Sequence, residues 1–302
     1  MAKPDTTELE RLAHPSAAAN FLGGSLYRGS LALLLGAGVS APLGGPSFPK
    51  LIDECLNGLG ELPFAGSDSE LGASRVVDIA DNKGVDLRGL LTGCLYPTNP
   101  PLASRLISST RLGALGAMLM GSKRGSVNSV LTLNFDSLLE EYLLLHGYVV
   151  NVVTKLPSLI GSEDVSVFHP HGYLPSKSGP GMASASSELI FSKESVLKML
   201  GSPSHATPLL IRQFVRSKVL VMLGISPTTA IGNALGPILL AEADGLRTER
   251  PSAFWIGAET PQADFRRVLL NANIVPVVLD SFEKIDEFLL EVCREAARQI
   301  PL

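Results

Sequence analysis

The stretch that most constrains the fold is LALLLGAGVSAPLGGPSF, residues 31–48. Its first five residues form an apolar run with the length of a buried strand. A glycine-containing turn at 36–41 follows, and a helix-like segment begins after Pro46. This order is the layout of a phosphate-binding βα unit, because glycines let the backbone turn tightly and approach a phosphate group closely. Residues 36–41 also fit the dinucleotide pattern G-x-G-x-x-[G/A], with Ala41 in the third glycine position.

Apolar runs alternate with helical patterns along most of the chain. This alternation predicts an α/β fold with a Rossmann-like, mostly parallel sheet and helices on both faces. The further predicted strands cover residues 127–136, 148–154, 165–172, 188–191, 218–226, 252–257 and 272–279. The predicted helices include 6–13, 138–147, 192–200, 209–217 and 228–243. We expect one domain over 1–302, with a core at about 25–59 and 126–302 and a mainly helical insertion at about 60–125.

Short local signals place two further helices. Ser47 is a residue type that caps helix N-termini, and Pro49 suits the first helical turn. The apolar residues of this helix fall on one face: Leu51, Ile52, Cys55, Leu56 and Leu59. The last helix, which begins at 280 or 281, is predicted to bury Phe282, Ile285, Phe288, Leu289 and Val292.

Composition narrows the class of protein. Hydrophobic residues make up 45% of the chain and charged residues 18%, which supplies a large core and argues against disorder. The net charge is −4, so we expect no direct nucleic-acid binding. The three cysteines, Cys55, Cys94 and Cys293, form no CxxC pair, which favours reduced thiols in a cytoplasmic protein.

The apolar run at 31–41 has the look of a signal-peptide core. The residues before it include Glu8 and Glu10 and lack a basic segment, so we expect no targeting peptide. No apolar run reaches the roughly 18 residues that a membrane span requires. We therefore expect no membrane association.

Glycine-containing or polar motifs follow four of the predicted strands. They are GAGVS at 36–40, NFD at 134–136, HPHG at 169–172 and GIS at 224–226. In parallel sheets, ligands bind beyond the carboxyl ends of the strands. The sequence therefore predicts that these motifs line the ligand site.

In this order the motifs resemble those of the sirtuin superfamily, and more narrowly those of its SIR2-like NAD-hydrolase branch. GAGVSAPLGGPSF is similar to the family's GAGxSxxxGxPxF nucleotide loop, and LNFD is similar to its QNxD box, with Leu133 in place of Gln. His171-Gly172 resembles the catalytic His-Gly, and GIS resembles the later GTS/GxS loop. The resemblance runs from about residue 25 to the C-terminus.

This resemblance implies cleavage of the nicotinamide–ribose bond of NAD through an oxocarbenium-like state. It implies that Asn134 holds the ribose or a water and that Asp136 binds the nicotinamide carboxamide. His171 would be the general base on a ribose hydroxyl or a water. The implied nucleotide contacts, with the pyrophosphate on the 36–40 backbone, fall on Gly36, Ala37, Gly38, Val39, Ser40, Pro46, Phe48, Gly224 and Ser226.

Each of these residues also has a purely structural interpretation. Asp136 could cap the helix that follows it, Asn134 could be a turn residue, and residues 224–226 could be a helix-start turn. His169 is expected to be a packed or hydrogen-bonded neighbour rather than a metal ligand. Because no Cys or carboxylate pair accompanies these two histidines, we expect no metal site.

Two departures from the protein-deacylating sirtuins narrow the expected activity. The chain has no cysteine between His171 and Val219, where those proteins carry two zinc-binding cysteine pairs. Ser47-Phe48-Pro49 stands where they carry Asp-Phe-Arg. The resemblance therefore implies an NAD glycohydrolase (NADase) that releases nicotinamide and ADP-ribose, as an effector of bacterial anti-phage defence. It also implies a homo-oligomer or a separate regulatory partner, such as a HerA-like ATPase or a short Argonaute.

Three other functions stay open at this point. The first is an NAD-dependent protein deacylase or ADP-ribosyltransferase, and the second is a non-catalytic sensor of NAD or ADP-ribose. The third is a dehydrogenase, which needs an acidic residue at the end of the second strand, about 20 residues after the glycine turn. Asp53 and Glu54 lie near that distance but fall on a predicted helix.

Overall fold

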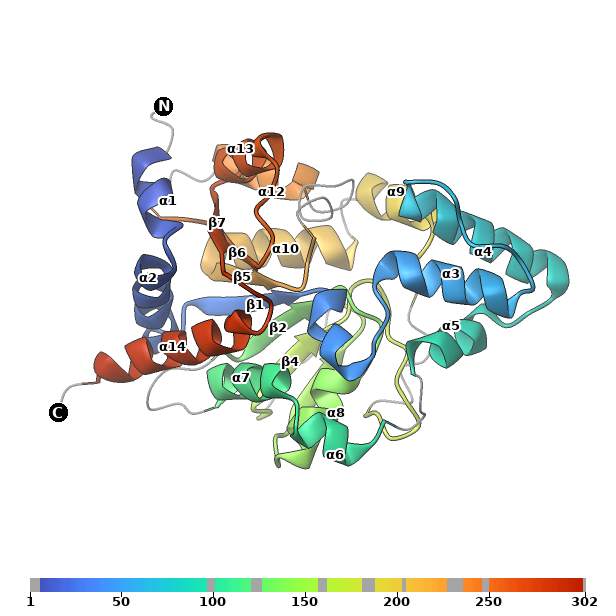
Figure 1. Ribbon diagram of the computed structural model, residues 1–302, viewed down its shortest axis with the longest axis horizontal. Helices are drawn as coiled ribbons and strands as arrows, with labels where there is room; N and C mark the ends of the chain where they lie inside the picture. The colour runs from blue at the N-terminus through green and yellow to red at the C-terminus, as the bar shows by residue number, and fades with distance from the viewer. Residues whose placement is uncertain are drawn as a thin grey trace.

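The computed structural model describes residues 6–96, 101–120, 127–156, 162–180, 188–202, 205–226, 236–245 and 250–300. Its seven-stranded sheet has the order β3-β4-β2-β1-β5-β6-β7 (Figure 1), and every neighbouring pair is parallel. This arrangement confirms the predicted α/β fold with a Rossmann-like sheet. The division into a core and an insertion stays a prediction.

The strands are short and mostly buried. Their bounds are β1 (Leu31–Leu35), β2 (Ser129–Thr132), β3 (Val150–Val153), β4 (Val165–Phe168), β5 (Val219–Leu223), β6 (Ala253–Gly257) and β7 (Ile274–Val278). The two central strands, β1 and β5, are buried along their whole length. Strands covered on both faces read as continuous apolar runs rather than as alternating patterns, which is why LALLL and VLVML stand out in the sequence.

Helices cover both faces of the sheet. The helices before β2 are α1 (Thr6–Leu12), α2 (Pro15–Tyr27), α3 (Phe48–Gly58), α4 (Ser69–Lys83), α5 (Leu87–Leu95), α6 (Ala103–Ile107) and α7 (Thr110–Leu119). Those after β2 are α8 (Leu138–Leu145), α9 (Lys193–Gly201), α10 (Ala206–Ser217), α12 (Gly236–Gly245), α13 (Ala263–Asn271) and α14 (Lys284–Arg298). In Figure 1, α10, α12 and α13 lie on one side of the sheet and α7, α8 and α14 on the other.

The side chains of β1 alternate between two hydrophobic cores, as the pleat of a strand requires. Leu31, Leu33 and Leu35 pack with residues of α2, α7 and α14, and Ala32 and Leu34 pack with residues of α10, α12 and α13. Both cores therefore meet at the strand that leads into the glycine turn. This packing fixes where the turn begins.

The topology places the four motifs at one edge of the sheet. The chain moves from β1 to β2 on one side and later returns to β5 on the other side of β1. The point where the strand order reverses is where open α/β sheets bind ligands. GAGVS, NFD, HPHG and GIS follow β1, β2, β4 and β5, which are four neighbouring strands.

Several local predictions are confirmed. The Ser47 side chain accepts the Lys50 N–H at the start of α3, and Pro49 lies in the first turn. The predicted apolar face of this helix is buried, Cys55 completely. Between β1 and β2 the structure places α3 to α7.

Other local predictions are wrong, each for an identifiable reason. Residues 188–191 form no strand, because the Ile190 N–H makes a single bond to the His171 carbonyl and no ladder. Phe282 is exposed, since it lies in the turn before α14. The helix α13 has no counterpart among the predicted elements. Residues 228–235 of the predicted 228–243 helix lie outside the described residues, and α12 covers its remainder.

Candidate active site

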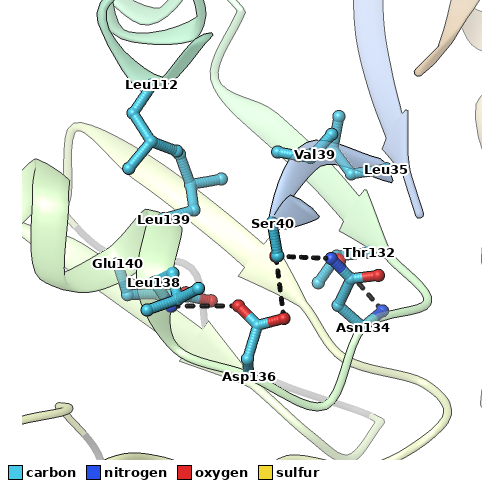
Figure 2. A pocket seen from close by; sticks show the side chains of 10 residues that line it. All are labelled: Leu35, Val39, Ser40, Leu112, Thr132, Asn134, Asp136, Leu138, Leu139 and Glu140. Atoms are coloured by element: carbon cyan, nitrogen blue, oxygen red, sulfur yellow. Dashed lines mark hydrogen bonds between the residues drawn. The ribbon is translucent and has the colours of Figure 1, made fainter. Parts of the chain in front are cut away.

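Three polar side chains from the ends of β1 and β2 form one hydrogen-bonded chain, here called the Ser40–Asn134–Asp136 chain. The Ser40 hydroxyl donates to Asp136 Oδ2 at 2.9 Å, although the two residues lie 96 positions apart (Figure 2). Asn134 Nδ2 donates to Ser40 Oγ at 3.2 Å and to the Gly36 carbonyl at 3.2 Å. The fold thus brings four of the predicted site residues into contact.

Asp136 is a buried carboxyl group that also hydrogen-bonds to the start of α8. Its Oδ1 accepts the Leu138 N–H at 3.1 Å, while Oδ2 accepts the Ser40 hydroxyl. Burial raises the pKa of Asp136 to about 6, against the opposing effect of these two hydrogen bonds. The N-cap position of α8 is Ser137, so Asp136 binds the first N–H of the helix from the preceding position. The same carboxyl group also belongs to the Ser40–Asn134–Asp136 chain.

The glycine turn after β1 packs directly against the turn after β5. A Cβ on Gly38 would lie 2.7 Å from the Gly224 Cα, and a Cβ on Gly224 would lie 2.5 Å from the Val39 nitrogen. Gly224 also has a φ of +66°, in the left-handed region. Contact between the two turns therefore requires glycine at both positions. The sequence suggests a different reason for these glycines, namely close approach of the backbone to a phosphate group.

Four backbone N–H groups of the glycine turn already donate within the protein. The bonds run from Gly36 N to Leu223 O at 2.9 Å, Gly38 N to Gly224 O at 2.9 Å, Val39 N to Gly36 O at 3.0 Å and Ser40 N to Ala37 O at 3.1 Å. In this conformation these amides are occupied by carbonyl groups of the protein. The pyrophosphate cradle at 36–40 therefore stays a prediction.

His171 lies in the turn after β4 and has a ring nitrogen without a partner. Its Nε2 atom is buried, and no described group hydrogen-bonds to it. Burial, with a smaller effect from the nearby His205, lowers the pKa of His171 to about 4. The imidazole is therefore neutral at pH 7. Among the described residues, no hydrogen bond links it to the Ser40–Asn134–Asp136 chain.

The backbone nevertheless fixes the HPHG turn beside the NFD motif. The Leu174 N–H donates to the Phe135 carbonyl at 2.7 Å, and the Gly172 N–H donates to the His169 carbonyl at 3.1 Å. His169 Nδ1 lies 3.0 Å from the Asn134 carbonyl oxygen. The turn that contains His171 is thus hydrogen-bonded to the segment that contains Asn134 and Asp136 of the Ser40–Asn134–Asp136 chain.

Glu140 is not among the residues predicted from the sequence, although it is completely buried and contacts His169 Nε2. One sequence feature could have indicated a buried Glu140. Glu140 and Glu141 are adjacent acidic residues within the apolar helix LLEEYLLL, where burial of a charge requires a partner. The expectation that His169 is a hydrogen-bonded neighbour is confirmed.

Glu141, also on α8, is the centre of a second buried hydrogen-bond network. Its carboxylate accepts the hydroxyl groups of Ser137, Ser176 and Ser178, each at 2.6 Å. The Tyr96 hydroxyl donates to the Leu174 carbonyl at 2.8 Å and so joins α5 to the same region. These bonds fasten residues 174–178 to α8, immediately after the HPHG turn.

The remaining predicted contacts are spread around the glycine turn. Phe48 packs edge-on against Phe191 at 5.7 Å between ring centroids, and Phe191 also meets Phe135 at 6.2 Å. Pro46 and Val39 are buried, Ala37 is partly exposed and Ser226 is exposed. Nothing in the sequence singles out Phe191, because its segment reads as a strand.

Two further observations on the described part of the chain concern metal-ligand clusters and membrane-spanning helices. Within the ranges that the structure describes, no cluster of three or more His, Cys, Asp or Glu side chains is arranged to hold a metal ion. Over the same ranges, no helix combines the length and apolar character of a bilayer-crossing segment.

The fold and the site together define a Rossmann-like α/β protein with polar groups gathered where the strand order reverses. A comparison with protein-family models matches residues 128–277, about half of the chain, to a SIR2-like domain. The chain therefore belongs to the SIR2-like superfamily, whose members are NAD-dependent enzymes. No curated protein matches the chain. The matched region contains Asn134, Asp136, His171 and Gly224, whereas the glycine turn precedes it.

Proposed function

We propose that this chain hydrolyses NAD at the nicotinamide–ribose bond and releases nicotinamide and ADP-ribose. The observation that supports this most strongly is the Ser40–Asn134–Asp136 chain at the carboxyl ends of β1 and β2. The neutral His171 lies in the turn fastened beside it. Membership of the SIR2-like superfamily supplies the substrate class.

In the proposed reaction the oxygen of a water forms a bond to the ribose C1′. The C1′–N bond breaks, and its electron pair goes to the nicotinamide nitrogen. His171 Nε2, which has no partner in the protein, accepts the proton that the water loses. A pKa of about 4 keeps the His171 imidazole unprotonated at neutral pH.

Asn134 suits the positioning role because its amide is already oriented. Nδ2 is held by the Gly36 carbonyl and the Ser40 hydroxyl, which leaves Oδ1 without a partner among the described residues. An amide oxygen accepts hydrogen bonds, so it can orient a ribose hydroxyl or a water. Asp136 would accept a hydrogen bond from the nicotinamide carboxamide.

Two assays distinguish NAD hydrolysis from protein deacylation and from non-catalytic NAD sensing. Incubation with NAD and an acyl-lysine peptide produces free ADP-ribose if the proposal holds, and O-acyl-ADP-ribose if the chain is a deacylase. A measurement of NAD binding covers the sensor function. If the chain binds NAD and forms no nicotinamide in any assembly state, the sensor interpretation replaces the hydrolase.

We propose a biological role in bacterial anti-phage defence by NAD depletion, with activity controlled by self-assembly or by a separate partner. The support for this role is the resemblance of the motifs to the defence branch of the family. The helices α6 and α8 contact each other, and exposed apolar side chains at their ends are available for such contacts: Leu102, which precedes α6, Ile107, Leu144 and Leu145. Expression in a host challenged with phage, with wild-type chain against Asn134→Ala, tests the role directly.

A further inference from the structure

Glu140 and His169 form a buried pair directly beneath the candidate site. Both side chains are essentially inaccessible to solvent, and Glu140 Oε1 contacts His169 Nε2. The other ring nitrogen, His169 Nδ1, lies 3.0 Å from the Asn134 carbonyl oxygen. One imidazole ring therefore bridges a carboxyl group on α8 and the backbone of the NFD motif.

The chemistry of these groups determines where the protons lie. A carbonyl oxygen only accepts, so Nδ1 carries a hydrogen and donates it to Asn134. A second proton is then shared between Nε2 and Glu140, either on the ring with an ionised carboxylate or on the carboxyl group with a neutral ring. In both cases the pair has no net charge, which is what burial of two titratable groups requires.

His169 is connected to two of the residues proposed to act on NAD, Asn134 and His171. Its Nδ1–H donates to the Asn134 carbonyl, and the Asn134 N–H donates to the Thr132 hydroxyl oxygen at 3.1 Å. Through its own carbonyl it accepts the Gly172 N–H at 3.1 Å and so closes the turn that contains His171. The Tyr173 ring packs against the His169 ring at 4.5 Å and restricts its rotation.

We propose that the Glu140–His169 pair is a positioning device for this reaction: Glu140 fixes the His169 ring, and the ring fixes Asn134 relative to His171. This inference rests on the proposed function for its catalytic consequence. Its structural content, that the Nδ1–H donor orders the Asn134 backbone, can be tested without turnover.

Two substitutions of His169 separate the two ring nitrogens. In His169→Asn the amide nitrogen replaces Nδ1 and keeps the donor to the Asn134 carbonyl. In His169→Gln the amide nitrogen replaces Nε2 and keeps the contact with Glu140, while the donor to Asn134 is lost. His146→Gln is the matched control, because His146 Nδ1 also lies against a backbone carbonyl, that of Tyr142 at 2.8 Å, at the far end of α8.

The kinetic test measures kcat and KM for NAD with the full chain. We expect His169→Gln to lower kcat about 100-fold with a smaller change in KM, because a misplaced catalytic group has an effect of this size. His169→Asn should retain at least about a tenth of wild-type kcat, since a neutral hydrogen bond of ordinary strength is worth about a factor of ten. His146→Gln should match the wild type. Equal losses of kcat in both His169 variants would overturn the proposal.

Hydrogen exchange provides the readout that does not depend on activity. We expect the segment 129–137 to exchange faster in His169→Gln than in His169→Asn, with thermal melting used to verify that both variants fold. Equal exchange in the two variants would refute the positioning role. If the wild type releases no nicotinamide, the proposed function fails, while this exchange measurement still decides whether His169 orders Asn134.

Discussion

The close contact between the turns after β1 and β5 predicts a large effect of Gly224→Ala on stability. Alanine at a φ of +66° costs about 1–2 kcal/mol, because the left-handed region brings Cβ near the following carbonyl. The new Cβ would also lie 2.5 Å from the Val39 nitrogen and 2.8 Å from the Gly36 oxygen. These are backbone atoms that cannot rotate away, and such overpacking costs about a further 1–3 kcal/mol. We expect a total loss of about 2–5 kcal/mol in the free energy of unfolding.

Gly84→Ala is the matched control for this prediction. Gly84 ends α4 with a φ of +64°, but a Cβ there would meet no atom within 4 Å. Its substitution should therefore cost only the conformational part, about 1–2 kcal/mol. Urea unfolding monitored by circular dichroism measures both variants under the same conditions. If Gly224→Ala and Gly84→Ala lose the same free energy, the two turns are not packed as described.

Two further predictions concern charge. Arg111→Ala should destabilise the protein by about 3–5 kcal/mol in urea unfolding, because it leaves Asp286 without its buried partner. Arg11→Ala removes an exposed pair with Glu8 and should change the stability far less. A small effect of Arg111→Ala would contradict a buried link between α7 and α14. The raised pKa of Asp136 means that its contribution to stability is complete below about pH 4 and is lost as the pH rises through about 6. Asp136→Asn should abolish this part of the pH dependence when the free energy of unfolding is measured between pH 4 and 7. If the variant and the wild type show the same dependence on pH, the Asp136 carboxyl group is not buried as described.

Much of the fold and part of the site could be predicted from the sequence. The glycine turn, NFD, HPHG and GIS each follow an apolar run, and a parallel sheet places the ends of such runs at one edge. The proximity of Ser40, Asn134 and Asp136 could be predicted in this way, and the structure confirms it. A structural role of Asp136 at the start of α8 is one of the interpretations that the sequence leaves open, and its carboxyl group does accept the Leu138 N–H.

The contacts across the sheet edge could not be predicted in this way. Glu140 and His169 are 29 residues apart, and no periodicity in the sequence relates them. The glycines suggested a phosphate site from their spacing alone, whereas the structure assigns Gly38 and Gly224 to mutual packing of two turns. Phe282 reads as the start of an apolar helix stripe, but the helix begins after it, so its side chain lies outside the stripe.

We propose that this site breaks the nicotinamide–ribose bond of NAD and transfers the ADP-ribose group to water. The most direct measurement is nicotinamide and ADP-ribose formation from NAD in ¹⁸O-labelled water, by the full chain with and without proteins encoded beside it. We predict equal amounts of both products, with the label on the C1′ hydroxyl of ADP-ribose, and loss of both in Asn134→Ala and His171→Ala variants that remain folded. Full activity in either variant, or no nicotinamide from the wild type under any of these conditions, would contradict NAD hydrolysis by this site.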